Sequence, residues 1–190
     1  MKKVALVTAL ALLCILFSIF RSEAQSMDKT VKVGGEMMYP SKNIIENAVK
    51  SKDHTTLVAA VKAGGLVETL QGKGPFTVFA PTNDAFENLP NGTVDGLLKP
   101  ESKKALTTIL TYHVIAGKMN ATDLISAIKK SGGKYVAETV SGHKLTFTMN
   151  GPANVMVWDE NENGANISIY DVNQSNGVIH VIDSVLLPKM

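Results

Sequence analysis

Cysteine is nearly absent from this sequence, and the one cysteine, Cys14, lies in an N-terminal apolar run at residues 4–20. If this run is removed on export, the remaining chain has no thiol. That excludes disulfide bonds, cysteine metal ligands and thiol redox chemistry from the mature protein. Its stability must then come from the packing of its core.

The apolar run has the flanks of a secretory signal peptide. Lys2 and Lys3 precede it, and Ser22 and Ala24 place small residues at the third and first positions before a cleavage point. The run is short for a membrane span. This order of charged, apolar and small residues predicts a signal peptide over residues 1–24.

Two alternative interpretations of this leader stay open. Arg21 directly after the run is compatible with a retained membrane anchor, as a stop-transfer charge. Cys14 is compatible with lipidation after cleavage, although Leu13 before it argues against this, because lipoprotein processing needs a small residue there.

An excess of charge of either sign is also absent from the predicted mature chain. Cleavage after residue 24 lowers the positive residues from 19 to 16 and the negative residues from 17 to 16, so the formal balance changes from +2 to 0. The lysines are spread along the chain, which argues against a nucleic acid partner. The remaining chain is long enough for one core, with about 70% of its unfolded surface buried.

The domain boundaries follow from composition. Residues 25–40 contain Gly34-Gly35 and few bulky apolar residues, and they predict a flexible N-terminal arm. Residues 41–188 contain regular apolar patterns and no long low-complexity linker, so they predict one folded domain.

Helical periods come first in this domain and strand periods later. Predicted helices begin after Asn43 and Asn120, which are good N-caps, and one ends at Gly64-Gly65. Alternating apolar residues at 145–149 predict a half-buried strand, and the apolar run at 178–187 predicts a strand covered on both faces. This order predicts an α+β domain with mostly antiparallel strands.

Three motifs carry a resemblance to a known family. GPFTVFAPTNDAF occupies residues 74–86, a Tyr-His pair follows at 112–113, and SNGVIHVIDSVLLP occupies residues 175–188. In this order they resemble the fasciclin domain over most of the chain. The resemblance implies a compact wedge of two small β-sheets with helices packed along one side. The motif residues are Phe79, Pro81, Thr82, Asn83, Phe86, Asn176, Gly177, His180 and Asp183.

The resemblance also suggests partner-binding residues. In animal members of the family, the region of the Tyr112-His113 pair and an Asp-Ile pair, here Asp171-Val172, are linked to integrin recognition. A structural role is the alternative for each. His113 and His180 fall on buried faces of a helix and a strand, where a hydrogen-bonded core histidine is expected. Asp171 can instead cap the turn before the last strand.

Catalysis and metal binding find little support in the sequence. Ser184, His180 and Asp183 are close in sequence, but His180 and Asp183 project to opposite faces of a strand, so they form no relay. The four histidines lack metal-ligand spacing. Residues 159–164 match the first half of an EF-hand loop, but Tyr170 stands where a glutamate is needed. We therefore expect no enzyme activity, no cofactor and no tight calcium site.

The leading functional expectation is a secreted or periplasmic adhesion or matrix module of a bacterial type, which binds an extracellular or envelope protein or glycan. After signal cleavage it would not insert stably in a membrane. The alternative is a carrier of an apolar small molecule, a lipid or a carotenoid, with Met37, Met38 and Tyr39 as an adaptable apolar surface. Four Asn-x-Ser/Thr sequences, at Asn91, Asn120, Asn166 and Asn173, would accept glycans in a eukaryotic secretory route.

Overall fold

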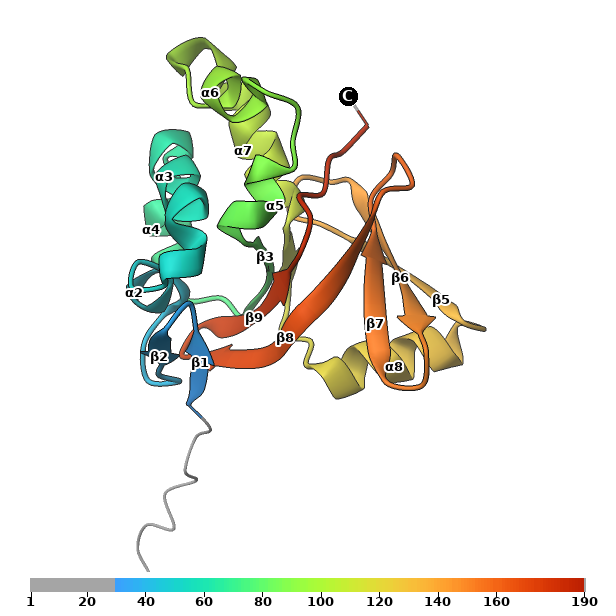
Figure 1. Ribbon diagram of the computed structural model, residues 1–190. Helices are drawn as coiled ribbons and strands as arrows, with labels where there is room; N and C mark the ends of the chain where they lie inside the picture. The colour runs from blue at the N-terminus through green and yellow to red at the C-terminus, as the bar shows by residue number, and fades with distance from the viewer. Residues whose placement is uncertain (1–29, 190) are drawn as a thin grey trace, which may run out of the picture.

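The computed structural model describes residues 30–189, so the predicted signal peptide lies outside the described residues. Within them, no helix is long and apolar enough to cross a membrane. The α+β prediction is confirmed (Figure 1). The elements are β1 (Val31–Val33), β2 (Glu36–Met38), α2 (Ile44–Ala48), η1 (Lys52–His54), α3 (Thr55–Gly64), α4 (Val67–Gln71), β3 (Phe76–Pro81), α5 (Asn83–Glu87), α6 (Thr93–Leu97), η2 (Pro100–Ser102), α7 (Lys103–Tyr112), β4 (Val114–Ala116), α8 (Ala121–Lys130), β5 (Lys134–Glu138), β6 (Lys144–Asn150), β7 (Asn154–Trp158), β8 (Gly164–Gln174) and β9 (Gly177–Ile182).

The prediction of a flexible arm over residues 25–40 is wrong for its described part. Strands β1 and β2 pair there as an antiparallel hairpin, and Val33 and Met38 are buried in the core. The turn uses Gly34 and Gly35, both at positive φ, which glycine adopts without strain. Asn47 holds the end of the hairpin, because its side chain bonds both the amide and the carbonyl of Tyr39.

The two motif runs form neighbouring parallel strands at the centre of the molecule. Strand β3 pairs with β9 so that Phe79 lies opposite His180. All six residues of β9 are buried, which confirms that the last strand is covered on both faces. Gly177 is required here, because a Cβ atom at this position would lie 2.2 Å from the Phe76 carbonyl oxygen.

Strand β8 joins the two sheets that the family resemblance implies. The strand order is β4-β3-β9-β8-β7-β6-β5, and β8 pairs with β9 along one part of its length and with β7 along another. The β8–β9 pairing contains register shifts between residues 167 and 172, where β8 bends out of one sheet into the other. Seven strands therefore form one continuous, strongly bent sheet.

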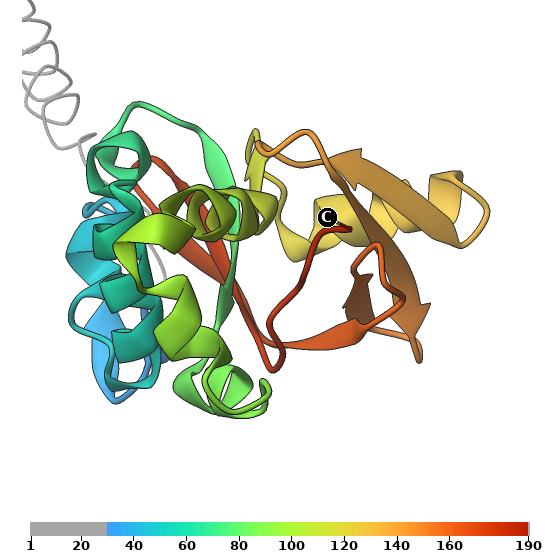
Figure 2. The ribbon, with the colours of Figure 1, turned by 90° about the horizontal axis from the view of Figure 1, so that it is seen from above.

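The helices begin and end largely where the sequence predicts. Asn43 caps α2, and its side chain accepts a hydrogen bond from the Glu46 amide at 2.9 Å. Gly65 ends α3 in the left-handed conformation. Helices α2 to α7 lie on one side of the molecule, but α8 packs against β5, β6 and β7 on the other (Figure 2). One of the longest helices thus departs from the expected one-sided arrangement.

Strands β3 and β9 separate two cores. The helical core lies between these strands and α2, α3, α4 and α7; its members include Ile44, Ile45, Val61, Val78, Leu110 and Ile179. The α8 core lies on the other face, between the strands, α8 and β5–β8; its members include Phe79, Tyr112, Leu124, Phe147, Val157 and Ile182. Because strand residues alternate in direction, neighbouring residues of β3 serve different cores.

Candidate functional site

Tyr112 ends α7 inside the α8 core and is completely buried. Its hydroxyl group donates a hydrogen bond to the Lys144 carbonyl at 2.8 Å and accepts one from the Glu160 amide at 3.0 Å. Burial raises the pKa of the Tyr112 phenol well above its ordinary value. The side chain therefore fastens α7 to β6 and to the loop after β7.

His113 follows Tyr112 and is also buried, as a structural histidine should be. Its Nδ1 lies 2.8 Å from the Ile109 carbonyl, and its Nε2 accepts a hydrogen bond from the Leu186 amide at 3.0 Å. These partners require a neutral ring with the proton on Nδ1. Burial lowers the pKa of His113 to about 4, so the ring stays neutral at pH 7.

His180 has the opposite arrangement of its two nitrogens. Nε2 bonds the Met119 carbonyl at 2.9 Å, and Nδ1 accepts a long hydrogen bond, 3.4 Å, from the Asp171 amide. The ring stacks on Phe79 and is fully buried, which confirms the predicted structural role. Both nitrogens are occupied and Ser184 bonds Asp183 instead, so these residues assemble no catalytic relay.

Asp171 caps a backbone amide, but a different one from that predicted. It sits within β8 at a φ of 55°, and its carboxylate accepts a hydrogen bond from the Ala121 amide at 2.7 Å. That amide is the first of α8, where a negative charge is favourable. The prediction of a cap on the turn before β9 is wrong, because β8 continues through Asp171 to Gln174.

Burial decides against most of the predicted partner-binding residues. Tyr112, His113 and Val172 are at most 4% exposed, so their side chains offer almost no surface for direct contact with a partner in this structure. Asp171 is half-buried, and its role in recognition stays a prediction.

The motif residues of the first run hold the start of α3 and α5. The Thr82 hydroxyl accepts a hydrogen bond from the Ala85 amide and caps α5. Asn83 accepts from the Thr56 amide at 3.0 Å and donates to the Lys52 carbonyl at 2.8 Å. Pro81 ends β3 in the core, and Phe86 packs on a small cluster around Ile109.

The motif residues of the second run join distant elements in the same way. Asn176 is buried; it accepts from the Ile44 amide and donates to the carbonyls of Leu70 and Gly72, at 2.8–3.0 Å. Asp183 is exposed, and its carboxylate accepts hydrogen bonds from the amide and the side chain of Asn166. The motif residues thus secure the fold.

The acidic loop after β7 is closed by its own aspartate. Asp159 is 5% exposed, and its two carboxylate oxygens accept four hydrogen bonds, from the amides of Asn161, Asn163 and Leu187 and from the Asn163 side chain. These donors occupy the oxygens that a calcium ion would use. Within residues 30–189, no group of three or more His, Cys, Asp or Glu side chains has the geometry of a metal site.

A surface that the motif analysis missed lies on the sheet face opposite α8. Trp158 on β7 is half-buried there, its indole nitrogen donates a hydrogen bond to the Thr148 hydroxyl at 2.8 Å, and Thr146 is its cross-strand neighbour. Gly164 on β8 leaves room for the ring, since a Cβ atom there would lie 3.1 Å from the indole. The alternation of Val155 and Val157 with Trp158 is the signal that could have identified this face.

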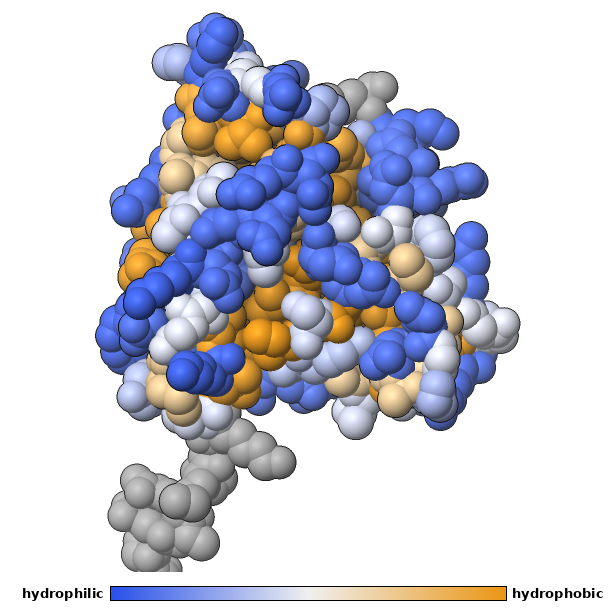
Figure 3. Space-filling model, in the orientation of Figure 1, coloured by the Kyte–Doolittle hydropathy of each residue, from blue (hydrophilic) through white to orange (hydrophobic). Residues whose placement is uncertain are grey.

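We call this surface the Trp158 face. It contains a groove of about 330 Å³ lined by Lys134, Thr146, Thr148, Trp158, Asp159 and Glu162. On the face drawn in Figure 3, hydrophilic residues are interspersed with hydrophobic ones, which gather over α6 and α7 and again in the lower centre of the view. An aromatic ring held between short hydroxyl side chains and charges of both signs is the composition of a protein-binding or glycan-binding surface.

Comparisons with known proteins agree on one family. The model of the fasciclin domain matches residues 52–188. Protein sll1483 of Synechocystis is 45% identical over 170 residues, which cover 89% of this chain and 86% of that protein. The immunogenic protein MPB70 of Mycobacterium bovis is 34% identical over 146 residues, 74% of this chain and 66% of that protein.

A solved structure shows the same fold. It is a domain pair from the insect cell adhesion molecule fasciclin I, with a TM-score of 0.69 and 18% identity; the match covers 88% of this chain and 65% of that chain. The matched motifs, the strand pair that they form and this likeness in fold place the chain in the fasciclin domain family.

Proposed function

We propose that this protein is an exported, non-enzymatic adhesion module that binds a protein or glycan of the extracellular matrix or cell envelope. The observation that carries the proposal is the match of the fasciclin domain model over residues 52–188. Relatives at the cell surface support it. One relative, 38% identical over 123 residues, is a cell surface glycolipoprotein of Mycobacterium bovis, and the solved relative is a cell adhesion molecule.

The Trp158 face is the surface that fits this function. The motif residues are engaged in holding the fold, whereas Trp158 and its neighbours Thr146 and Lys134 lie on a solvent-facing sheet. Val136, on the same face of β5, is 46% exposed. Tryptophan contributes more binding energy at interfaces than most residues, because its large ring loses little conformational freedom on binding.

A surface-binding assay tests the proposal. The purified protein is applied to immobilised envelope or matrix extract from its own source, next to variants Trp158→Ala and Tyr39→Ala. Tyr39 is an exposed aromatic residue on the hairpin side, so it is the matched control. We expect binding by the wild type, at least about tenfold weaker binding by Trp158→Ala and no change for Tyr39→Ala.

The same assay separates three parts of the proposal: the class of partner, the adhesion function and the role of the Trp158 face. Protease treatment of the extract removes a protein partner, and periodate treatment removes a glycan partner. Absence of wild-type binding to the untreated extract would overturn the adhesion function itself. Unchanged binding by Trp158→Ala would leave adhesion standing and remove the Trp158 face from it.

A further inference from the structure

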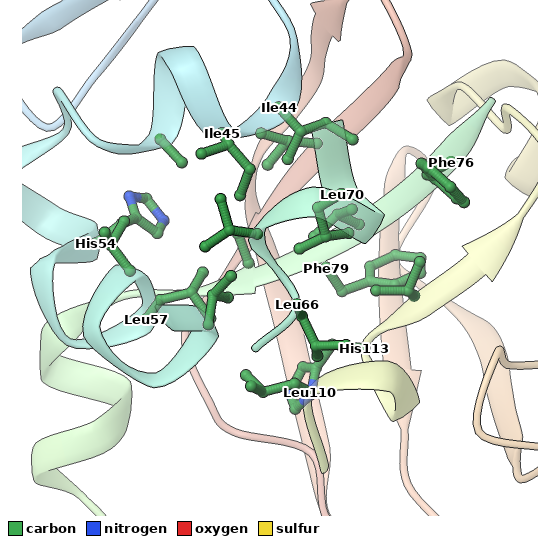
Figure 4. Close-up of a pocket in the computed structure, with 18 of the residues that line it drawn as sticks. Ile44, Ile45, His54, Leu57, Leu66, Leu70, Phe76, Phe79, Leu110 and His113 are labelled. Carbon is green, nitrogen blue, oxygen red and sulfur yellow. The ribbon is translucent and has the colours of Figure 1, made fainter. Parts of the chain in front are cut away.

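A cavity of about 100 Å³ lies inside the helical core. It is bounded by the β1–β2 hairpin, by α2, α3, α4 and α7, and by the inner face of β3 and β9 (Figure 4). Its wall is almost entirely aliphatic and includes Ile45, Leu57, Val61, Leu66, Leu70 and Leu110. A cavity of this kind stays dry and gains free energy when an apolar molecule fills it.

His54 is one of the few polar residues in this wall. It is 4% exposed, and in Figure 4 its imidazole ring lies at one end of the cavity, beside Ile45 and Leu57. Nδ1 lies 2.8 Å from the Ser51 hydroxyl oxygen. Nε2 is buried and makes no hydrogen bond of normal geometry, although the Ala80 backbone lies near enough to raise the pKa of the ring. A buried polar atom without a partner is uncommon, because the unmade hydrogen bond is lost free energy.

Ser51 and the hairpin turn that packs on it determine the orientation of His54. The turn of the hairpin packs directly on Ser51, since a Cβ atom at Gly34 would lie 2.2 Å from the Ser51 hydroxyl oxygen. The Gly34 carbonyl also accepts a hydrogen bond from the Lys52 amide at 3.2 Å. Ser51 is thus packed against the hairpin, and its hydroxyl group orients the ring through Nδ1.

The ring is neutral at pH 7. Burial lowers the pKa of His54, and this outweighs the opposite effects of the Ala80 carbonyl and of Asp53. A neutral imidazole has one donor and one acceptor nitrogen, and either tautomer leaves Nε2 able to bond a hydroxyl group, which both donates and accepts.

Part of the cavity wall lies close to the surface. Val49 on the end of α2 and Val140 after β5 belong to the lining, and they are 49% and 47% exposed. The lining shares no residue with the groove of the Trp158 face, so binding here is independent of the proposed adhesion function.

We propose that this cavity binds a compact apolar alcohol or phenol, with its ring or alkyl body against the aliphatic wall and its hydroxyl group on His54 Nε2. The cavity of about 100 Å³ is smaller than the apolar cavity of about 150 Å³ that holds benzene in another protein, so it limits the ligand to one small ring or a short alkyl chain. A carotenoid or a long-chain lipid is too large to be enclosed in this space.

Titration with phenol and benzene tests this proposal. Binding to the purified protein is followed by calorimetry and by the methyl resonances of Ile45, Leu57 and Leu110. We expect both probes to shift these resonances and phenol to bind about five- to tenfold more tightly, because it makes one additional hydrogen bond. In His54→Leu this preference should disappear, while in His143→Leu, a half-exposed histidine of the sheet side, it should remain.

Two further measurements cover a His54→Leu protein that does not fold. Phenol should shift the Nε2 resonance of His54 in the wild type, and Val58→Phe, which fills the cavity from α3, should weaken binding of both probes. Absence of any shift at the cavity methyl groups, or equal affinity for phenol and benzene in the wild type, would overturn the proposal.

Discussion

The two cores on either side of β3 and β9 are packed in different ways. The α8 core is built around aromatic rings in contact, with the ring centres of Phe79 and Phe147 5.3 Å apart and that of Tyr135 5.9 Å from Phe147. The helical core is aliphatic and surrounds a cavity of about 100 Å³. The difference indicates that the α8 core secures the fold, whereas the helical core leaves space that a ligand can occupy.

The buried histidines also differ from one another, in how many of their ring nitrogens form hydrogen bonds. His113 and His180 have both ring nitrogens engaged with backbone groups, although His113 lines the cavity as His54 does. His54, on the helical side, has one nitrogen engaged and one free. The first two stabilise the fold through their hydrogen bonds. In contrast, Nε2 of His54 makes no hydrogen bond, so it does not stabilise the helical core.

The largest effect is expected from truncation of His113. His113→Ala would leave the Ile109 carbonyl and the Leu186 amide without partners and open a cavity at the end of α7. We expect a loss of about 3–5 kcal/mol of unfolding free energy. Urea denaturation measures it. A loss below about 1 kcal/mol would mean that these two hydrogen bonds contribute little.

Acid should weaken the fold through the same residue. The pKa of His113 is about 4 in the folded protein against 6.5 in the unfolded chain, so the unfolded chain binds more protons between these values. Stability is full above pH 6.5 and falls as the pH decreases towards 4, by about 3 kcal/mol from His113 alone. His54 and His180, whose pKa values are also lowered, act in the same direction.

Urea denaturation at pH 7 and pH 4.5 measures this dependence. His113→Leu, which cannot take up a proton, is the control and should lose less stability between the two pH values than the wild type. Equal wild-type stability at both pH values would contradict the assignment of neutral, buried histidines.

A smaller loss is expected at His180. Its hydrogen bond to the Asp171 amide is long, at 3.4 Å, so the bond to the Met119 carbonyl and the stacking on Phe79 carry most of its contribution. We expect His180→Ala to lower the unfolding free energy by about 1–3 kcal/mol. An unchanged melting temperature would contradict the burial of this ring.

The smallest loss belongs to the cap of α8. Asp171→Ala removes the acceptor for the Ala121 amide and should lower stability by about 1 kcal/mol. Asp171→Asn keeps an acceptor oxygen and tolerates the left-handed backbone, so it should lose less. Normal stability of Asp171→Ala with loss of adhesion would instead restore the recognition role that the family resemblance suggests.

Local signals made much of this fold predictable. Asn43 and Asn120 precede helices as caps, Gly65 ends one, and the unbroken apolar run of β9 indicates burial on both faces. The hairpin is not evident from composition, because Gly34-Gly35 is typical both of a flexible segment and of a tight turn. Val31 and Val33 before these glycines show the alternation of a strand, which is the signal of a tight hairpin.

The remaining features depend on contacts between distant residues. Asp171 and the Ala121 amide that it caps are 50 positions apart. The cavity requires walls from the hairpin, from four helices and from strands β3, β4, β8 and β9, and no local pattern distinguishes a packed aliphatic stripe from one that faces empty space. His54 lies outside the family motifs, so its unpartnered nitrogen became visible only in the folded chain.

The most direct test of the contrast between the cores is the unfolding free energy of His54→Leu beside that of His113→Leu, measured by urea denaturation at pH 7. Leucine is similar in size and has no polar atom, so it removes one made and one unmade hydrogen bond at position 54 and two made bonds at position 113. We predict that His54→Leu stays within about 1 kcal/mol of the wild type or is more stable, whereas His113→Leu loses about 2–4 kcal/mol. Equal losses in the two variants would contradict the account, because His54 would then support the fold as His113 does.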